Sequence, residues 1–128
     1  MKHPFRKKWG QNFLRDPNII RKIISSLELD KNDVILEIGP GDGALTNKLH
    51  SQVDHIHGVE IDPLLIKQLE EKQYVNVSLY REDILKWDMG ILPEDIKIIG
   101  KVIDIKIGLT PISKRFFAKI ISEKSISV

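Results

Sequence analysis

The stretch VILEIGPGDGALT, residues 34–46, decides the fold of this chain. It begins with a short, mostly apolar run, which is typical of a buried strand in a parallel sheet. Three alternating glycines follow at Gly39, Gly41 and Gly43, and the residues after them favour a helix. Glycine permits the tight turn that such a connection needs. The turn is therefore either purely structural or built to hold a ligand, such as a phosphate, a nucleotide or a methyl donor.

Strand and helix patterns alternate on both sides of this turn. Asp16 and Pro17 are a typical helix start, because aspartate caps a helix and proline suits its first position. Isoleucine and leucine then recur at helical spacing to about residue 28. Further helices are expected at 44–49 and 63–72, and strands at 33–39, 55–62, 75–83 and 95–100. The alternation predicts an α/β fold with a parallel sheet and crossover helices.

The pattern weakens after Gly100, where the sequence predicts a helix over 113–123. Because a doubly wound fold usually has more strands than the four or five found here, we expect only the N-terminal part of such a sheet. Residues 1–15 carry five lysines and arginines among three aromatic residues. They are interpreted as a basic arm in front of a single small domain, residues 16–128.

The composition narrows the class of protein. At 41% hydrophobic and 30% charged residues, with a net charge of +2, it is typical of a soluble globular domain. The absence of cysteine excludes disulfides and thiolate metal sites and fits a reducing compartment, so we expect a cytoplasmic location. We also expect a monomer. No apolar run approaches the roughly 18 residues that span a bilayer, so no membrane association is expected. The four histidines have no convincing metal-ligand spacing, and packing is the favoured role for them and for Trp9 and Trp87.

The charge of the glycine turn argues against a phosphate ligand. Its G-x-G-x-G spacing differs from the G-x-G-x-x-G pattern of dinucleotide sites, which hold a pyrophosphate on free backbone N–H groups. Pro40 removes one such donor, and Asp42 and Glu37 bring negative charge. S-adenosylmethionine carries a sulfonium, an ammonium and no phosphate, so it suits an acidic turn.

Two further carboxylates follow the next strands. Glu60 ends the second strand, 19 residues after Gly41, which is the spacing of an acid that binds ribose hydroxyls. Asp83 ends the third strand and is suited to accept from an adenine amine. Carboxyl ends of parallel strands meet at one edge of a sheet, so we expect one ligand crevice there. Taken singly, each carboxylate is equally well interpreted as a solvated strand end.

Four segments resemble the rRNA adenine dimethyltransferases, and specifically the type that modifies small-subunit rRNA. They are KKWGQNFLRDPNIIRKI (7–23), VILEIGPGDGALTNKL (34–49), GVEIDPLL (58–65) and REDILKWD (81–88). The resemblance runs from about Arg6 to Gly100. It implies a Rossmann-like class I S-adenosylmethionine-dependent methyltransferase fold, S-adenosylmethionine as cofactor, and the rRNA of the small ribosomal subunit as partner.

The resemblance also implies roles for single residues. Asn12 and Leu14 match residues that close over the methyl donor, and Gly39 matches the glycine whose backbone approaches its methionine part. Glu60 matches the ribose-binding acid, and Asp83 matches the adenine-binding acid.

The chain departs from the family pattern directly after Gly100. There the family has Asn-Leu-Pro-Tyr, whose asparagine accepts from the target adenine, whereas this chain has Lys101 at the asparagine position. Lysine offers no acceptor, and its charge opposes a sulfonium. TPI at 110–112 matches the family two residues late, and the C-terminal helical domain is expected to be absent. Two hypotheses follow: an rRNA adenine dimethyltransferase, or a truncated, catalytically impaired module that binds S-adenosylmethionine or RNA.

Overall fold

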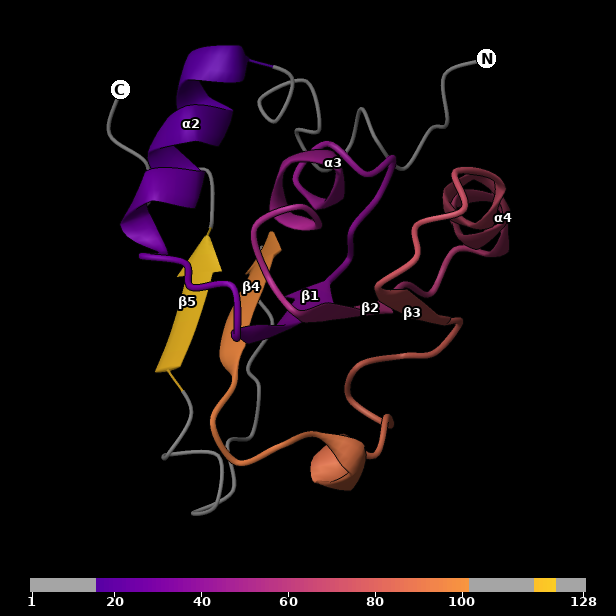
Figure 1. Ribbon diagram of the computed structural model, residues 1–128. Helices are drawn as coiled ribbons and strands as arrows, with labels where there is room; N and C mark the ends of the chain where they lie inside the picture. Colours follow the sequence, from indigo (N-terminus) through magenta and orange to yellow (C-terminus); the bar gives the residue numbers. More distant parts are fainter. Residues whose placement is uncertain (1–15, 102–116, 122–128) are drawn as a thin grey trace.

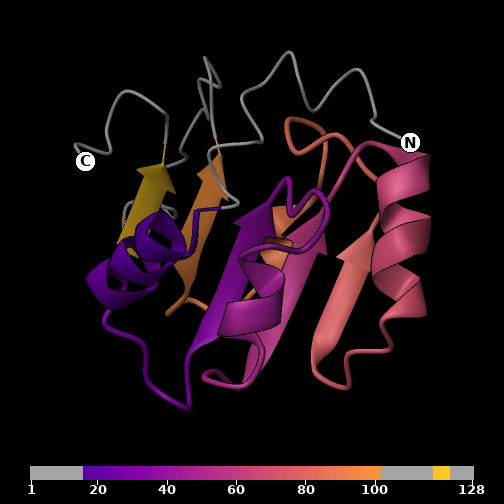
Figure 2. The same ribbon diagram turned by 90° about the horizontal axis from the view of Figure 1, so that it is seen from above.

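The computed structural model describes residues 16–101 and 117–121. These residues form a five-stranded sheet in the order β3-β2-β1-β4-β5, in which every neighbouring pair is parallel. Figure 2 shows the strands pointing the same way. The strand order reverses between β1 and β4, which is the switch point where open α/β sheets bind their ligands. The strands are β1 (Val34–Ile38), β2 (His55–Val59), β3 (Val77–Tyr80), β4 (Lys97–Lys101) and β5 (Phe117–Ile121).

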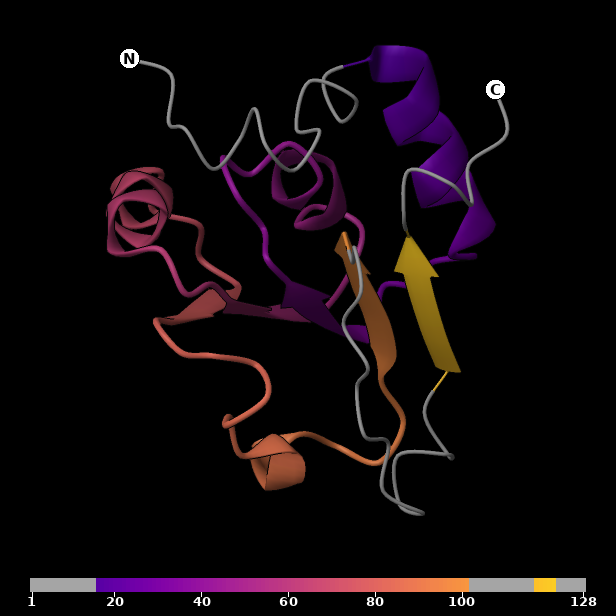
Figure 3. The same cartoon turned by 180° about the vertical axis from the view of Figure 1, so that it is seen from behind.

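The described helices cover one face of this sheet. They are α2 (Pro17–Ser26), α3 (Thr46–Leu49) and α4 (Pro63–Glu71), whereas the short 3-10 helix η2 (Met89–Ile91) lies on the opposite side (Figures 1 and 3). Two of these helices begin at an Asp-Pro pair. Asp16 accepts a hydrogen bond from Asn18 N at 2.9 Å, and Asp62 accepts one from Leu64 N at 2.9 Å. The helix start predicted at Asp16 is therefore confirmed.

The hydrophobic core has two layers, one on each face of the sheet. Successive side chains of a strand point to opposite faces, so Ile35 joins the layer under the helices and Leu36 joins the other. The helix-side layer also contains isoleucines of α2, together with Leu45 just before α3 and Leu49 within it, and the opposite layer contains residues around η2. Its buried members are Leu36, Ile38, Val59, Leu92, Ile96 and Ile98. Both faces of β1 are thus buried, as the apolar run predicts.

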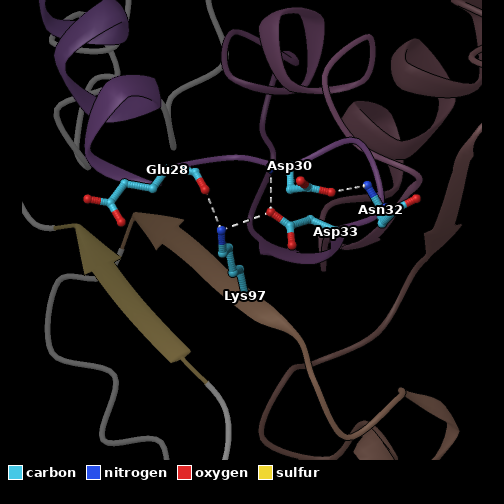
Figure 4. A network of polar contacts seen from close by, with 5 residues as sticks. All are labelled: Glu28, Asp30, Asn32, Asp33 and Lys97. Carbon is cyan, nitrogen blue, oxygen red and sulfur yellow. Dashed lines mark hydrogen bonds and ion pairs between the residues drawn. The ribbon is translucent and has the colours of Figure 1, made fainter.

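A lysine joins distant segments at the edge of the sheet where the strands begin, which we call the amino edge. Lys97 Nζ donates to Glu28 O at 2.6 Å and to Asp33 Oδ2 at 2.8 Å, and Asp30 N also donates to Asp33 Oδ2 at 2.7 Å (Figure 4). Burial raises the pKa of Asp33, but the hydrogen bonds from Lys97 and Asp30, together with the lysine charge, lower it below its ordinary value. Lys97 therefore fastens the start of β4 to the loop before β1.

The predicted alternation of strands and helices is confirmed up to Lys101, with ends that differ by a few residues. The helix predicted over 113–123 is wrong at 117–121, where β5 pairs with β4 in five parallel register positions. An open sheet edge supplies backbone hydrogen-bond partners that local helical spacing does not reveal. Within 16–101 and 117–121, no helix has the length and apolar character needed to cross a bilayer.

Candidate functional site

The glycine turn leaves β1 at the carboxyl edge of the sheet, the edge where the strands end. Gly39, Gly41 and Gly43 have φ angles of 66°, 61° and 89°, in the left-handed region that strongly favours glycine. Gly39 N donates to Val59 O at 2.8 Å, so the turn starts by extending the pairing of β1 with β2. The turn therefore begins beside the end of β2.

The glycines differ in what surrounds them. A Cβ atom on Gly43 would lie 3.0 Å from Leu69 Cδ2, 3.1 Å from Lys72 Nζ and 3.3 Å from Tyr74 OH. A Cβ atom on Gly39 would meet no atom of residues 16–101 within 4 Å. Gly43 thus serves close packing against α4 and the residues after it. Gly39 borders open space, where its backbone is accessible to a ligand.

Glu60 holds the turn in place from the end of β2. Its side chain is only 7% exposed. Its Oε1 accepts from Gly41 N at 3.0 Å, and its Oε2 accepts from Asp62 N at 3.1 Å. Burial raises the pKa of Glu60, and the backbone N–H groups of Asp62 and Gly41 oppose that shift. A carboxylate has about four acceptor positions, so this bridge leaves acceptor capacity on both oxygens.

Glu37 is a second buried carboxyl group below the turn. Its Oε1 accepts a hydrogen bond at 2.6 Å from Thr46 Oγ1, at the first residue of α3. Burial raises the pKa of Glu37 to about 7, the charge of Glu60 adds to the shift, and the Thr46 hydrogen bond opposes it. Glu37 therefore keeps its proton to a higher pH than an exposed glutamate does, whereas the sequence alone suggested a fixed negative charge. The single acid in the apolar run of β1 was the signal for this burial.

The other two acids at this edge lie in local turns. The Asp83 carboxylate, three residues after β3, accepts from Leu85 N at 3.0 Å. Asp42 Oδ1 accepts from Ala44 N at 3.3 Å, and Lys72 Nζ donates to the Asp42 carbonyl oxygen at 2.8 Å. Hydrogen bonds thus join the glycine turn to Glu60. The hydrogen bond that the Asp83 carboxylate accepts stays within its own turn, although Asp83 follows the strand beside β2.

The remaining predicted site residues lie at the limits of the described structure. Asn12 and Leu14 lie outside the described residues, as does the basic arm. Lys101 is the last residue of β4, and only its backbone is described. Among residues 16–101 and 117–121, no group of three or more histidines and carboxylates is arranged to hold a metal ion.

The histidines of β2 pack against β3. His55 Nε2 lies 2.7 Å from Ser78 Oγ, and His57 Nδ1 lies 3.0 Å from Tyr80 OH. The Tyr80 and Trp87 rings are in contact, with centroids 5.0 Å apart. Burial lowers the pKa of His57, and the neighbouring His55 adds to the shift. The packing role predicted for these histidines and for Trp87 is confirmed.

Comparison with known proteins identifies the family. The model of the ribosomal RNA adenine dimethylase family matches residues 2–127 of the chain. The chain belongs to this family. The match to the dimethylase family extends past Gly100, so it includes the segment in which the Asn-Leu-Pro-Tyr sequence is missing.

Two curated relatives carry the name ribosomal RNA small subunit methyltransferase A. The protein of Aromatoleum aromaticum is 42% identical over 78% of this chain and 38% of its own length. That of Lachnoclostridium phytofermentans is 40% identical over 97% of this chain and 45% of its own length. The dimethylase-family chain therefore spans less than half the length of these relatives.

A solved structure supports the fold. The crystal structure of the 23S rRNA methyltransferase ErmE superimposes with a TM-score of 0.71 at 29% identity, over 86% of this chain and 47% of ErmE. The Rossmann-like class I methyltransferase fold predicted for this dimethylase-family chain is confirmed.

Proposed function

We propose that the chain forms the S-adenosylmethionine-binding part of an enzyme that dimethylates adenines in small-subunit (16S) ribosomal RNA. The observation that carries this proposal is the open glycine turn, which Gly41 ties to Glu60 at the carboxyl edge, next to the switch point of the sheet. Open α/β sheets bind ligands at this position. Membership of the dimethylase family supports the choice of reaction.

The hydrogen bonds of the turn favour a cationic donor over a pyrophosphate. Pro40 has no N–H group, and the N–H of Gly41 is already used by Glu60. Phosphate sites at strand-helix turns depend on such free N–H groups. Buried carboxyl groups at Glu37 and Glu60 suit the positive charges of S-adenosylmethionine instead.

Each part of the donor has a candidate partner in this proposal. The acceptor capacity that remains on Glu60 suits the ribose hydroxyls, and Asp83 suits the adenine amine. The backbone of Gly39 borders the methionine part, and Asn12 and Leu14 close over the donor. A Glu60→Ala variant is expected to weaken donor binding at least tenfold, because it removes both the ribose acceptor and the brace of the turn.

The proposed chemistry is direct methyl transfer aided by positioning. The lone pair of the adenine amine attacks the sulfonium methyl group, the carbon–sulfur bond breaks, and S-adenosylhomocysteine leaves. The amine proton passes to solvent, and a second donor repeats the step. Such an adenine has to be taken out of its stack to reach the donor.

A second candidate function is a binding module that has lost this transfer. The observation that favours it is Lys101 at the family's asparagine position, at the very end of β4. A lysine cannot accept a hydrogen bond from the adenine amine. In this alternative the chain holds S-adenosylmethionine or RNA without turnover.

Two measurements separate the candidates. Calorimetry with S-adenosylmethionine tests the donor site, and transfer of a tritiated methyl group to unmodified small-subunit rRNA tests the reaction, with large-subunit rRNA as the control substrate. Binding with transfer supports the enzyme, and binding without transfer supports the module. Absence of donor binding contradicts the enzyme and also the module that binds S-adenosylmethionine.

The small-subunit substrate is proposed from the relatives. Both curated relatives named above are small-subunit enzymes at 40–42% identity, whereas the large-subunit enzyme ErmE is 29% identical. We further propose that the chain acts as a monomer in the cytoplasm. Sedimentation of the purified chain tests the monomer, and a dimer at micromolar concentration contradicts it.

The basic arm is proposed to contact the RNA backbone. Replacement of Arg6, Lys7 and Lys8 together by alanine is expected to weaken RNA binding. Each phosphate contact that is lost lowers the number of counterions that the RNA releases on binding. The slope of log affinity against log salt concentration should fall by up to about three units. Donor binding is the control and should stay unchanged. An unaltered salt slope assigns the arm to a solvated terminus.

A further inference from the structure

We propose that Glu37 is a proton-linked positioning residue: binding of the cationic methyl donor expels a proton from its buried carboxyl group, and the carboxylate that remains strengthens binding. This inference rests on the proposed S-adenosylmethionine site. Glu37 lies below the glycine turn, and its ionisation responds to the charge of the bound donor.

The position of Glu37 supports this role. It lies two residues before Gly39 and is only 2% exposed, so its carboxyl group is shielded from bulk water. The Thr46 hydroxyl donates to its Oε1, a hydrogen bond that favours the ionised form. The Glu60 carboxylate acts in the opposite direction, as a like charge. The two protonation states are thus close to balance before any ligand arrives.

The groups around Glu37 come from every neighbouring element. Thr46 belongs to α3 and Glu60 follows β2, whereas its register partners Gly58 in β2 and Ile99 in β4 carry no ionisable group. Tyr74, after α4, has a pKa raised by burial and by the charges of Glu37 and Asp42.

Lys72 is a cation at the glycine turn, and its ammonium group contacts the backbone. Lys72 Nζ donates to the carbonyl oxygen of Asp42, whereas the carboxyl groups of Glu37 and Glu60 accept from N–H and hydroxyl donors of the described residues. A cation bound beside the turn therefore adds an attraction that the described residues of the free chain do not give these carboxyl groups. That attraction shifts Glu37 toward the carboxylate.

The proton balance fixes the direction of the pH dependence. With a pKa of about 7, free Glu37 is neutral in mild acid and ionised in mild base. The donor lowers this pKa in the complex, so binding near neutral pH releases up to one proton from Glu37 to solvent. Affinity is then expected to rise as the pH approaches 7 and to level off above it.

The test compares the wild-type chain with Glu37→Gln across the range from about pH 5.5 to about pH 8.5. The glutamine keeps the shape of the neutral acid and its acceptor for Thr46. Because the donor's own amine titrates equally in both experiments, the ratio of the two dissociation constants isolates Glu37. The ratio is expected to be near one in acid and to reach about tenfold in favour of wild type in base, if binding lowers the pKa by about one unit.

Two variants of Thr46 give a matched second test that keeps Glu37 itself. Thr46→Val removes the hydroxyl that favours the carboxylate, so the midpoint of the pH dependence should move to higher pH. Thr46→Ser keeps the hydroxyl and should leave the midpoint in place. Equal midpoints in the valine and serine variants contradict the inference.

The outcomes distinguish this inference from the proposed function. Donor binding with a ratio that does not change with pH overturns the role of Glu37 and leaves the donor site standing. Failure of the wild-type chain to bind the donor at any pH overturns the donor site and the inference with it. Calorimetry near pH 7 in two buffers of different ionisation enthalpy counts the protons directly, and wild type is expected to release more protons on binding than Glu37→Gln does.

Discussion

The two edges of the sheet use the same residue types in opposite ways. At the amino edge, Asp33 accepts from Lys97, and its pKa lies below its ordinary value (Figure 4). At the carboxyl edge, Glu37 and Glu60 are more deeply buried, and burial raises the pKa of both. Among the described residues, their hydrogen-bond partners are a hydroxyl and backbone N–H groups rather than a lysine.

The difference separates a contact made for stability from one suited to binding. A carboxylate with a lysine partner is already compensated, so the amino edge gains little from a further cation. A buried carboxyl group with no cationic partner among the described residues can still gain a favourable electrostatic interaction when a cation binds beside it. Perturbed acids of this kind cluster at functional sites, which agrees with the donor site proposed at the carboxyl edge.

The largest effect on stability is expected from Glu37→Gln. The folded pKa of about 7 lies above the ordinary value of 4.5, so the free energy of unfolding of wild type should fall as the pH rises from 4.5 to about 7. The variant lacks this loss and should gain up to about 3 kcal/mol relative to wild type over that interval. Urea unfolding at both pH values measures it, with the exposed Glu71→Gln as control. Parallel pH dependence in wild type and Glu37→Gln contradicts the buried, protonated acid.

The two ends of the glycine turn should respond differently to alanine. Gly43→Ala is expected to lower the free energy of unfolding by about 2 kcal/mol. Alanine is strained in the left-handed backbone conformation of this position, and its Cβ would also crowd Leu69. Gly39→Ala meets no neighbour and should cost only about 1 kcal/mol. It should weaken donor binding instead, since the Cβ occupies open space at the proposed site. Equal losses of stability contradict the difference in packing.

At the amino edge, the expected effect is confined to stability. Lys97→Met keeps the apolar stem and removes the charge, and it should lower the free energy of unfolding by about 1–2 kcal/mol, as expected for a half-buried ion pair. Because the pKa of Asp33 is lowered, this contribution is present above pH 3.8 and lost as the pH falls below it. Lys86→Met, at an exposed position, is the control. Donor binding should not change, and weaker binding contradicts the separation of the two edges.

The sequence by itself determined the architecture up to β4 and indicated where the proposed site lies. The apolar run of β1, the spaced glycines and the Asp-Pro pair at 16–17 act through local sterics and hydrogen bonds, so they are legible without neighbours. Glu60 was found because its spacing from Gly41 follows from the length of one strand–helix–strand unit.

Only the tertiary structure decided the charge of Glu37, the packing of Gly43 and the strand at 117–121. Each depends on residues distant in the chain or on burial: Glu37 on Thr46 and Glu60, and Gly43 on Leu69 and the residues after α4. The strand depends on the open edge of β4. Ionisation in particular follows from desolvation, which a linear pattern of residues does not contain.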